Sequence, residues 1–170
     1  MKPLELVVAA DEGHGIGKGG KLPWRLPGEM AYFKRLTSEA RPGLQNAVLM
    51  GRKTYESIAP KFRPLAGRRN VVLSRAAWAA EGATTVHTLD EAITVSGEVD
   101  HLYVIGGGEV YRQALSHPAC ARVYLTRVHA RFDCDTFLPA LDASFARTRS
   151  DGPHAEAGLT YSFEVWERSA

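Results

Sequence analysis

The stretch VIGGGEVY, residues 104–111, joins an apolar strand pattern to the start of a helix through three consecutive glycines. Free backbone N–H groups at the N-terminus of a helix form an anion site, and the missing side chains let a phosphate come close. A tight turn between strand and helix is the structural alternative, but such a turn rarely needs three glycines in a row. The stretch therefore predicts a phosphate-binding turn between a strand and a helix.

Strand and helix patterns alternate along the chain on both sides of this stretch. Short apolar runs predict buried strands at 4–10, 47–51, 70–74, 84–87, 101–106 and 122–128. Helices are expected between them at 28–40, 53–58, 90–95 and 108–116. Strands joined by helices indicate the α/β class, with a mainly parallel sheet covered on both faces.

The C-terminal part of the chain has a different pattern. FARTRSD and LTYSFEVWER flank the stretch DGPHAEAG, residues 151–158, without a helix between them. This order predicts an antiparallel hairpin that closes one edge of the sheet, with its turn in DGPHAEAG.

Composition narrows the class of protein. The chain has 170 residues, of which 45% are hydrophobic, so we expect one domain spanning residues 1–170. Lysine and arginine total 21 against 19 acidic residues, and the net charge of +2 gives no support for a nucleic-acid or membrane partner. No apolar run reaches 18 residues and the first one ends at Asp11, so we expect a cytoplasmic protein.

The sequence has no pattern typical of a metal site. Its two cysteines, Cys120 and Cys134, do not form a ligand set, and its six histidines lack spacing such as HExxH. We therefore expect no metal, and free thiols rather than a disulfide.

A second group of glycines follows the first strand, in DEGHGIGKGGKLPW at 11–24. GIGKGG satisfies the dinucleotide pattern GxGxxG, but Leu22 and Pro23 follow where a helix should open. The phosphate-loop pattern fails as well, because it needs Ser or Thr in place of Leu22. Five glycines among eight residues indicate either a mobile lid that folds over a ligand or a plain flexible loop.

The expected helix in LPGEMAYFKRLT, residues 26–37, carries Glu29 in its first turn. At about 100° per residue, Phe33, Leu36 and Ala40 fall within about 40° of Glu29 around the helix axis. Glu29 therefore points along the apolar stripe. It is either an exposed carboxylate that stabilises the helix dipole, or a buried one whose pKa is raised by desolvation.

Hydrogen-bond donors follow two neighbouring strands. Arg52, Lys53 and Thr54 come directly after the strand at 47–51, and Ser74 and Arg75 come at the end of NVVLS. Donors at the carboxyl ends of parallel strands suit a phosphate monoester in the crevice of an α/β sheet.

Eight blocks of sequence together identify a family. They are GIGKGGKLPW, LPGEMAYFKRLT, VLMGRKTYESI, RPLAGRRNVVLSR, VIGGGEVY, VYLTRV, DTFLP and YSFEVWER, and they extend along essentially the whole chain. In order and spacing they resemble dihydrofolate reductase of the chromosomal bacterial and eukaryotic type. The resemblance implies a central eight-stranded, mostly parallel sheet with an antiparallel C-terminal strand, flanked by about four helices.

The resemblance also implies an activity. A member of this family reduces 7,8-dihydrofolate to tetrahydrofolate with NADPH, supplies one-carbon metabolism and binds antifolate inhibitors; we expect a monomer. Hydride passes to C6 of the pterin and a proton to N5. Since the acidic residue binds the 2-amino and N3 edge of the pterin, water is the expected immediate donor to N5, which the carboxylate makes more basic.

Site residues on the substrate side follow from the resemblance. Glu29 matches the acidic residue that hydrogen-bonds the pterin, so the buried interpretation is favoured, and Thr126 matches the threonine bonded to that carboxylate. Arg68 matches the arginine that binds the α-carboxylate of the folate glutamate, a bidentate task for which lysine is a poor substitute. The other substrate contacts implied are Val8, Ala9, Phe33, Ile58, Leu65 and Ile105.

Site residues on the cofactor side follow in the same way. Leu22 matches the lid residue over the nicotinamide, and Tyr111 lies near that ring, so these two join Glu29 and Thr126 in the implied catalytic set. The family has an unusual cis peptide between the first two glycines of the turn. The cofactor contacts implied are Ala9, Ile16, Gly51, Arg52, Lys53, Thr54, Ser74, Arg75, Ile105, Gly106, Gly107, Gly108, Glu109, Val110 and Tyr111.

Two positions depart from the family pattern. Glu109 stands where some members have arginine, and His87 stands where a basic residue often helps to hold the 2′-phosphate. Preference for NADPH would then depend more heavily on Arg52 and Arg75, and we expect reduced selectivity over NADH.

Three alternatives compete with this assignment. A related pyrimidine reductase of the same fold would keep the glycine turn but lack the LPW and acidic-helix blocks. A phosphate-loop kinase would need Ser or Thr at position 22 and an acid for Mg²⁺. A folate-binding module without catalysis stays open on motifs alone, although Glu29 and the glycine turn favour the enzyme.

Overall fold

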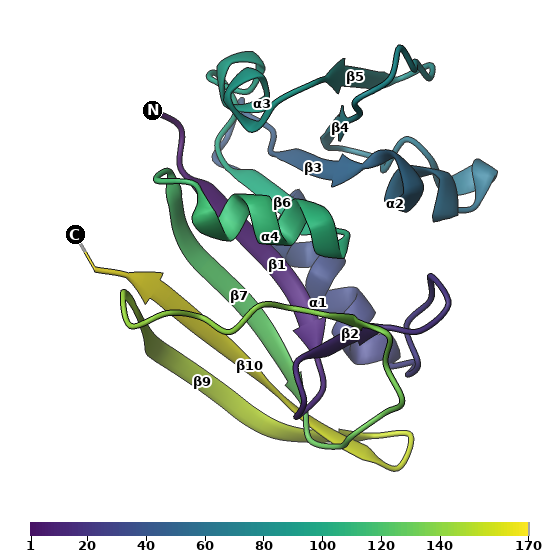
Figure 1. The fold of residues 1–170 in the computed structure, drawn as a ribbon, viewed down its shortest axis with the longest axis vertical. Helices are drawn as coiled ribbons and strands as arrows, with labels where there is room; N and C mark the ends of the chain where they lie inside the picture. The colour runs from purple at the N-terminus through teal and green to yellow at the C-terminus, as the bar shows by residue number, and fades with distance from the viewer. Residues whose placement is uncertain (170) are drawn as a thin grey trace.

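The computed structural model describes residues 1–169 and has an eight-stranded sheet at its centre (Figure 1). The expected α/β class is therefore confirmed. Along the chain the strands of this sheet are β1 Leu4–Ala10, β3 Ala47–Gly51, β4 Arg69–Leu73, β5 Ala83–Val86, β6 Leu102–Gly106, β7 Cys120–Val128, β9 Phe145–Glu156 and β10 Leu159–Arg168.

The sheet is parallel except at its C-terminal strand. Its order is β5-β4-β3-β6-β1-β7-β10-β9, and β10 runs antiparallel to both β7 and β9. β1 lies between β6 and β7, where its apolar residues are buried from both sides. Central parallel strands that read as continuous apolar runs are what a sheet covered on both faces requires.

Helices cover the two faces of the sheet. α3 Leu89–Val95 and α4 Gly108–Ser116 pack over Leu6 and Val104 in one hydrophobic cluster. α1 Pro27–Ser38 and α2 Arg52–Ser57 join Val7 and Met50 in a second cluster on the other face. Figure 1 shows α4 in front of the sheet and α1 behind it.

Helix α1 ends two residues earlier than expected from its apolar stripe. Glu39, at its C-terminus, already has extended dihedral angles (φ −72°, ψ 120°), so Ala40 lies outside the helix. The buried amide of Asn46, just before β3, donates to the carbonyl oxygens of Thr37 and Glu39 at 3.0 and 2.8 Å. This side chain satisfies carbonyl groups that the end of a helix leaves free.

The C-terminal hairpin forms as expected, but its turn is shorter. β9 continues through DGPHAE, and the chain reverses at Ala157 and Gly158, which both have positive φ (53° and 76°). Asp151 pairs with Phe163 and His154 with Tyr161, so two residues of β9 face Ser162 alone. Gly152 and Pro153 therefore mark a β-bulge in an edge strand, where proline is tolerated, rather than the turn.

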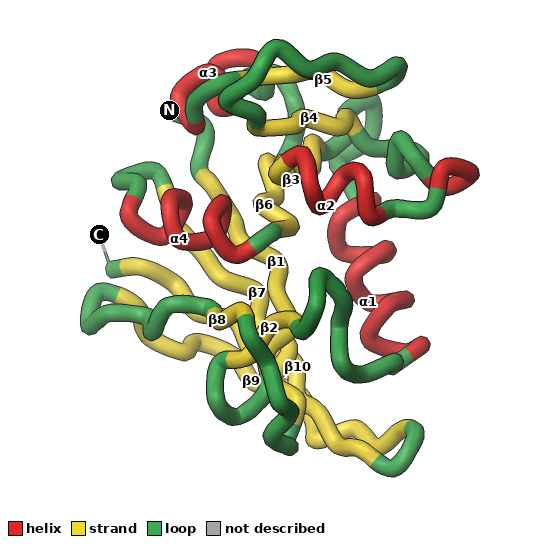
Figure 2. Tube along the Cα trace, turned by 45° about the vertical axis from the view of Figure 1, so that its right-hand side comes forward, coloured by secondary structure: helices red, strands yellow, loops and turns green. Residues whose placement is uncertain are grey.

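A small second sheet was not expected from the sequence. β2 Gly15–Gly17 pairs antiparallel with β8 Thr136–Phe137, and a short 3₁₀ helix lies at Pro60–Phe62. In Figure 2 the β2 and β8 strands lie together in front of the ends of β1 and β10. This pairing connects the early glycine-rich segment to DTFLP, more than a hundred residues later.

Candidate active site

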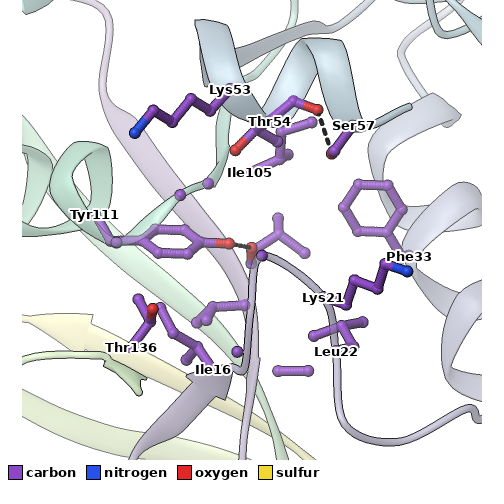
Figure 3. A pocket seen from close by; sticks show the side chains of 18 of the residues that line it. Ile16, Lys21, Leu22, Phe33, Lys53, Thr54, Ser57, Ile105, Tyr111 and Thr136 are labelled. Carbon is purple, nitrogen blue, oxygen red and sulfur yellow. Dashed lines mark hydrogen bonds between the residues drawn. The ribbon is translucent and has the colours of Figure 1, made fainter. Parts of the chain in front are cut away.

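A cavity of about 620 Å³ opens where β1 and β6 end (Figure 3). The carboxyl ends of parallel strands are where α/β sheets bind ligands. Four further segments close the cavity: α1, α2, the N-terminus of α4, and the loop around β2 with β8. The residues that line it are Val7, Val8, Ala9, Ile16, Gly17, Gly20, Lys21, Leu22, Glu29, Met30, Phe33, Lys53, Thr54, Ser57, Ile105, Gly106, Gly107, Gly108, Tyr111 and Thr136.

Among the described residues, Glu29 is the one carboxylate in this wall. Its side chain is buried, with 8% of the residue exposed, and its Oε1 accepts a hydrogen bond of 3.4 Å from Thr126 Oγ1. Burial raises the pKa of Glu29, and the weaker effect of the Thr126 hydroxyl lowers it by less. Within residues 1–169 no basic side chain forms a salt bridge with Glu29. The structure therefore places this carboxylate in the desolvated setting that suits proton chemistry.

The entry of α1 orients Glu29 toward the cavity. Leu26 precedes the helix without a side-chain cap, and Pro27 opens it. The N–H of Gly28 instead donates to Glu156 Oε1 of β9 at 2.9 Å. A Cβ at Gly28 would lie 2.7 Å from the Tyr161 hydroxyl, so glycine allows the first turn to approach the hairpin.

The glycine turn, Gly106 to Gly108, connects β6 to α4. Gly106 has φ +136°, the Gly106–Gly107 peptide is cis, and a Cβ on Gly107 would lie 3.3 Å from Thr54 Oγ1. A Cβ on Gly108 would lie 2.8 Å from Thr136 Cγ2. Backbone conformation and close packing thus account for glycine at 106 and 108 without a ligand. No side chain caps α4, however, so its first N–H groups are available to an anion.

Tyr111 forms part of the same wall with its hydroxyl already bonded. The hydroxyl donates to the carbonyl oxygen of Val7 at 2.7 Å, and the residue is buried. Burial raises the pKa of Tyr111 well above its ordinary value. The ring can contact a ligand, but the hydroxyl proton is held by β1 (Figure 3).

Cationic side chains are distributed unevenly around the turn. Lys53 lines the cavity, whereas Arg52 forms an ion pair with Glu56 at 3.3 Å and lies over the ring of Trp78. The side chain of Arg75 is 90% exposed and lies 3.9 Å from Glu109. Positive charge is therefore present in the cavity wall, at Lys53, and at the surface beside the cavity, at Arg52 and Arg75.

Two further residues lie beside Arg75. The hydrogen bond from Arg112 lowers the pKa of the exposed Glu109 to about 2, so this carboxylate stays charged. His87 Nδ1 lies 2.7 Å from the carbonyl oxygen of Ser74. Glu109 and His87, the two positions that depart from the family pattern, are thus both hydrogen-bonded within the chain.

Arg68 lies outside the cavity wall, beside Thr37 in the last turn of α1. Its Nη1 donates to Thr37 Oγ1 and its Nε to the Ala66 carbonyl oxygen, both at 3.0 Å. Desolvation lowers the pKa of this half-buried guanidinium, and in the described part of the chain no carboxylate pairs with it. A guanidinium held in place without a counter-ion is suited to a carboxylate from outside.

Comparison with known proteins identifies the family. A family model described as dihydrofolate reductase matches residues 3–168. The chain belongs to the dihydrofolate reductase family. The dihydrofolate reductase of Drosophila melanogaster is 37% identical over 180 residues, which cover 99% of each chain. The solved structure of Schistosoma mansoni dihydrofolate reductase superposes with a TM-score of 0.84 at 38% identity, and 99% of each chain is covered.

Bifunctional plant proteins are also similar to this chain. The bifunctional dihydrofolate reductase-thymidylate synthase of Glycine max is 40% identical over 180 residues, which cover 99% of this chain but 34% of that protein. The chain therefore spans about a third of the length of these bifunctional relatives.

Many residues implied by the dihydrofolate reductase resemblance meet in the cavity wall. Those in the wall are Val8, Ala9, Ile16, Leu22, Glu29, Phe33, Lys53, Thr54, Ile105, Gly106, Gly107, Gly108 and Tyr111. Others lie outside it: Gly51, Arg52, Ile58, Leu65, Arg68, Ser74, Arg75, Glu109, Val110 and Thr126. Of these, Ile58 and Leu65 pack, like Phe33, against the hydrophobic cluster that contains Val7 and Met50. Thr126 does not line the cavity and is connected to it through its hydrogen bond to Glu29. Their roles toward ligands stay predictions.

Sequence reasoning missed seven residues of the wall: Val7, Gly17, Gly20, Lys21, Met30, Ser57 and Thr136. Met30 and Ser57 could have been found, because Met30 follows Glu29 and Ser57 lies one turn after Thr54 on α2. Thr136 belongs to DTFLP, a block that carried the resemblance without an assigned role. Its pairing with β2 gives no periodic signal.

Neither membrane nor metal features stand out in the described structure. Within residues 1–169, no helix combines the length and apolar character needed to cross a bilayer. No three His, Cys, Asp or Glu side chains in that range lie close enough together to hold a metal ion. Both cysteines are free: Cys120 is buried and Cys134 partly so. The expected absence of a metal stays a prediction.

Proposed function

We propose that this member of the dihydrofolate reductase family reduces 7,8-dihydrofolate to tetrahydrofolate with NADPH. The observation that carries the proposal is the buried carboxylate of Glu29, which shares one cavity with the glycine turn of α4. A carboxylate can bind the amino and N3 edge of a pterin through two hydrogen bonds. The uncapped N-terminus of α4 can bind a phosphate group.

The residues present fit NADPH as the cofactor. Gly106, Gly107 and Gly108 contribute only backbone atoms to the wall beside α4, and Lys53 and Thr54 line the same cavity. We assign the phosphates to these groups and the 2′-phosphate to Arg52, Ser74 and Arg75. When bound, NADPH supplies the hydride.

The chain's own residues orient the substrate and exclude water. Phe33, Ile58 and Leu65 form the apolar surface for the pterin and the benzoyl group, while Arg68 binds the α-carboxylate of the glutamate tail. Ile16 and Leu22 lie on the loop that closes the cavity, where they can keep bulk water from the reacting atoms.

Glu29 acts on the proton rather than on the hydride. Bound to the 2-amino and N3 edge, its carboxylate is too far from N5 to protonate it directly, so water delivers that proton. The negative charge of Glu29, held in a desolvated pocket, stabilises the protonated pterin and so raises the basicity of N5. Thr126 keeps the carboxylate oriented through its hydroxyl.

The direct test follows the NADPH absorbance band with the purified chain. We expect absorbance to fall only when both NADPH and dihydrofolate are present, and an antifolate to stop the loss. Absence of turnover despite dihydrofolate binding, measured by fluorescence titration, would instead identify a folate-binding module without catalysis. Absence of binding would contradict the assigned site.

The state of the enzyme in the cell is a further part of the proposal. We propose a cytoplasmic monomer. Light scattering of the purified chain should give the mass of one copy, 18.6 kDa. A mass of twice that value would overturn the monomer, and recovery of the native protein in the membrane fraction would overturn the location.

A further inference from the structure

Asp11 is a buried acid that lies beside the cavity without lining it. It follows directly after β1 and is 2% exposed. Its Oδ1 accepts hydrogen bonds from the N–H groups of Gly13 and Gly15 at 2.8 and 2.7 Å, and its Oδ2 accepts one from the N–H of Phe132 at 2.9 Å. Three backbone donors from two separate loops therefore meet at one carboxylate.

The charge of Asp11 is balanced by backbone groups rather than by a basic side chain. Arg127 donates to its carbonyl oxygen at 2.9 Å, and within residues 1–169 no salt bridge involves its carboxylate. Burial raises the pKa of Asp11, but the hydrogen bonds from the three N–H groups and from the Cys134 thiol together lower it by more, so the group stays ionised at neutral pH. Buried N–H groups that lose such an acceptor are costly to leave unpaired.

The two loops joined by Asp11 form one side of the cavity. Gly15 begins β2, and Phe132 leads into β8 by way of Asp135, whose N–H donates to the Gly17 carbonyl oxygen at 2.9 Å. The segment from Gly15 to Leu22, together with Thr136, supplies Ile16, Gly17, Gly20, Lys21, Leu22 and Thr136 to the wall. We call these residues the β2–β8 wall.

This wall meets the glycine turn directly. A Cβ on Gly108 would lie 2.8 Å from Thr136 Cγ2 and 3.8 Å from Ile16 Cδ1. A shift of the wall by a fraction of an ångström would therefore change the shape of the cavity beside the N-terminus of α4.

We infer that Asp11 is a positioning residue that holds the β2–β8 wall in the geometry needed for hydride transfer. The inference rests on the proposed reductase function. The partners of the Asp11 carboxylate are Gly13, Gly15, Phe132 and the Cys134 thiol, whose Sγ donates to Oδ2 at 3.8 Å, and none of these four lines the cavity. Asp11 therefore acts through the loops and is not a catalytic residue. Its removal should alter the reaction step more than it alters the binding of dihydrofolate, which contacts other walls of the cavity.

The test compares Asp11→Asn with a matched control. Asparagine keeps the shape but offers one acceptor oxygen and an NH₂ group, which cannot accept from the remaining N–H donors. Asp133→Asn removes an equal charge from the same loop, where the Asp133 side chain is 95% exposed and, within residues 1–169, pairs only with Lys18 at 3.0 Å. Exposed pairs of this kind contribute little, so the control should behave as the parent.

Two readouts separate positioning from general stability. In the chain without ligands, Asp11→Asn leaves without an acceptor the N–H groups that face its NH₂ group, which are either that of Phe132 or those of Gly13 and Gly15. Amide hydrogen exchange at these N–H groups should accelerate at least about tenfold, the effect of losing one ordinary hydrogen bond. Exchange in the centre of β1 should stay as in the parent. In single-turnover experiments the hydride-transfer rate should fall about tenfold or more, as expected for misplaced reacting groups, while dihydrofolate affinity changes less than about twofold.

The outcomes decide between the alternatives. Uniformly faster exchange across the sheet, or an unchanged hydride-transfer rate, would show that Asp11 serves only general stability and would overturn the inference. If Asp11→Asn does not fold, Asp11→Ser, whose hydroxyl still accepts one N–H, is judged by the same two readouts. Hydrogen exchange needs no activity. An inactive parent would therefore refute the reductase function, while the effect of Asp11 on the β2–β8 wall could still be measured.

Discussion

Glu29 combines three properties that are rarely found together in one glutamate. It is buried, its pKa is raised by that burial, and a single hydroxyl, that of Thr126, hydrogen-bonds its side chain within the described chain. Arg68 shows the complementary arrangement, a half-buried cation without a carboxylate partner in residues 1–169. Residues kept unpaired at some cost to stability are typical of sites that bind charged or polar groups.

Arg68→Leu should weaken dihydrofolate binding by about 10- to 150-fold, the equivalent of the roughly 1.5 to 3 kcal/mol of a charge-assisted hydrogen bond. A pterin analogue without the glutamate tail should bind as it does to the parent, because only the tail carboxylate meets the guanidinium. Arg68→Lys should recover little, since an ammonium lacks the planar fork. Fluorescence titration measures all three, and equal weakening of both ligands would make Arg68 structural.

Removing the charges of Arg52 and Arg75 together should raise KM for NADPH far more than KM for NADH. Charge-assisted bonds of about 1.5 to 3 kcal/mol each are lost only with the phosphorylated cofactor. Arg41→Gln, which removes a charge paired with the distant Asp100, is the control. Equal losses with both cofactors would refute the assignment of the 2′-phosphate to these arginines.

At the residue scale, the sequence predicted the features that produce a periodic or compositional pattern. The phase of Glu29 on the apolar stripe was visible because Phe33 and Leu36 recur at helical spacing. Thr126 and Arg68 carried no local signal and were reached through the family resemblance. Lys21 and Gly20 were missed because a cavity wall is assembled from segments that meet only after folding.

The elements around the cavity depend on close contacts between their ends. α4 begins at Gly108 against Thr136 of β8, and Gly28, in the first turn of α1, lies against Glu156 of β9. At both helix starts a glycine lets a distant strand approach the backbone.

Gly108→Ala should reduce the free energy of unfolding by about 1 to 3 kcal/mol, because the added methyl lies 2.8 Å from Thr136 Cγ2. Thr136→Ser removes that methyl group and should restore most of the loss in the double variant. Gly97→Ala is the control, since its Cβ would meet only Thr94 O at 3.5 Å. Urea unfolding without ligands measures the series, and a double variant as unstable as Gly108→Ala would contradict the contact.

Long apolar strands were predicted to within about two residues, since burial on both faces imposes a continuous signal. β2 and β8 were not predicted, because three and two residues are too short for any periodicity. Gly152 and Pro153 were assigned to a turn, although the chain bends there by a bulge and reverses later at Ala157 and Gly158. Glycine and proline mark irregular backbone without stating its kind.

At the scale of the molecule, the cavity forms because the strand order brings distant segments together. The order β5-β4-β3-β6-β1-β7-β10-β9 places the ends of β1 and β6 side by side, with α1 and α4 on opposite faces. Periodicity indicates strands but not their order, and the resemblance implied only an eight-stranded, mostly parallel sheet with an antiparallel C-terminal strand. The whole fold keeps Glu29 desolvated, so we expect this one residue to affect both the stability and the activity of the protein.

Glu29→Gln should raise the free energy of unfolding at neutral pH, by an amount of the order of 0.5 to 2 kcal/mol. Burial raises the pKa of Glu29 in the folded state, so above the pKa of the unfolded chain the folded protein binds more protons and its stability falls as pH rises. The difference between variant and parent should therefore vanish in acid, below the unfolded pKa. Chemical unfolding across pH measures it, and a variant less stable than the parent at every pH would contradict the burial argument.

The most direct measurement for the whole account is the single-turnover hydride-transfer rate of Glu29→Gln and of the parent across pH, with a deuterated cofactor confirming that chemistry is timed. At neutral pH the variant should be slower by about 10² to 10⁴, the range typical of lost acid–base assistance. As pH falls, more dihydrofolate carries its N5 proton unaided, so the variant's rate should climb toward that of the parent. A variant that matches the parent at neutral pH would show that Glu29 does not assist protonation and would contradict the account.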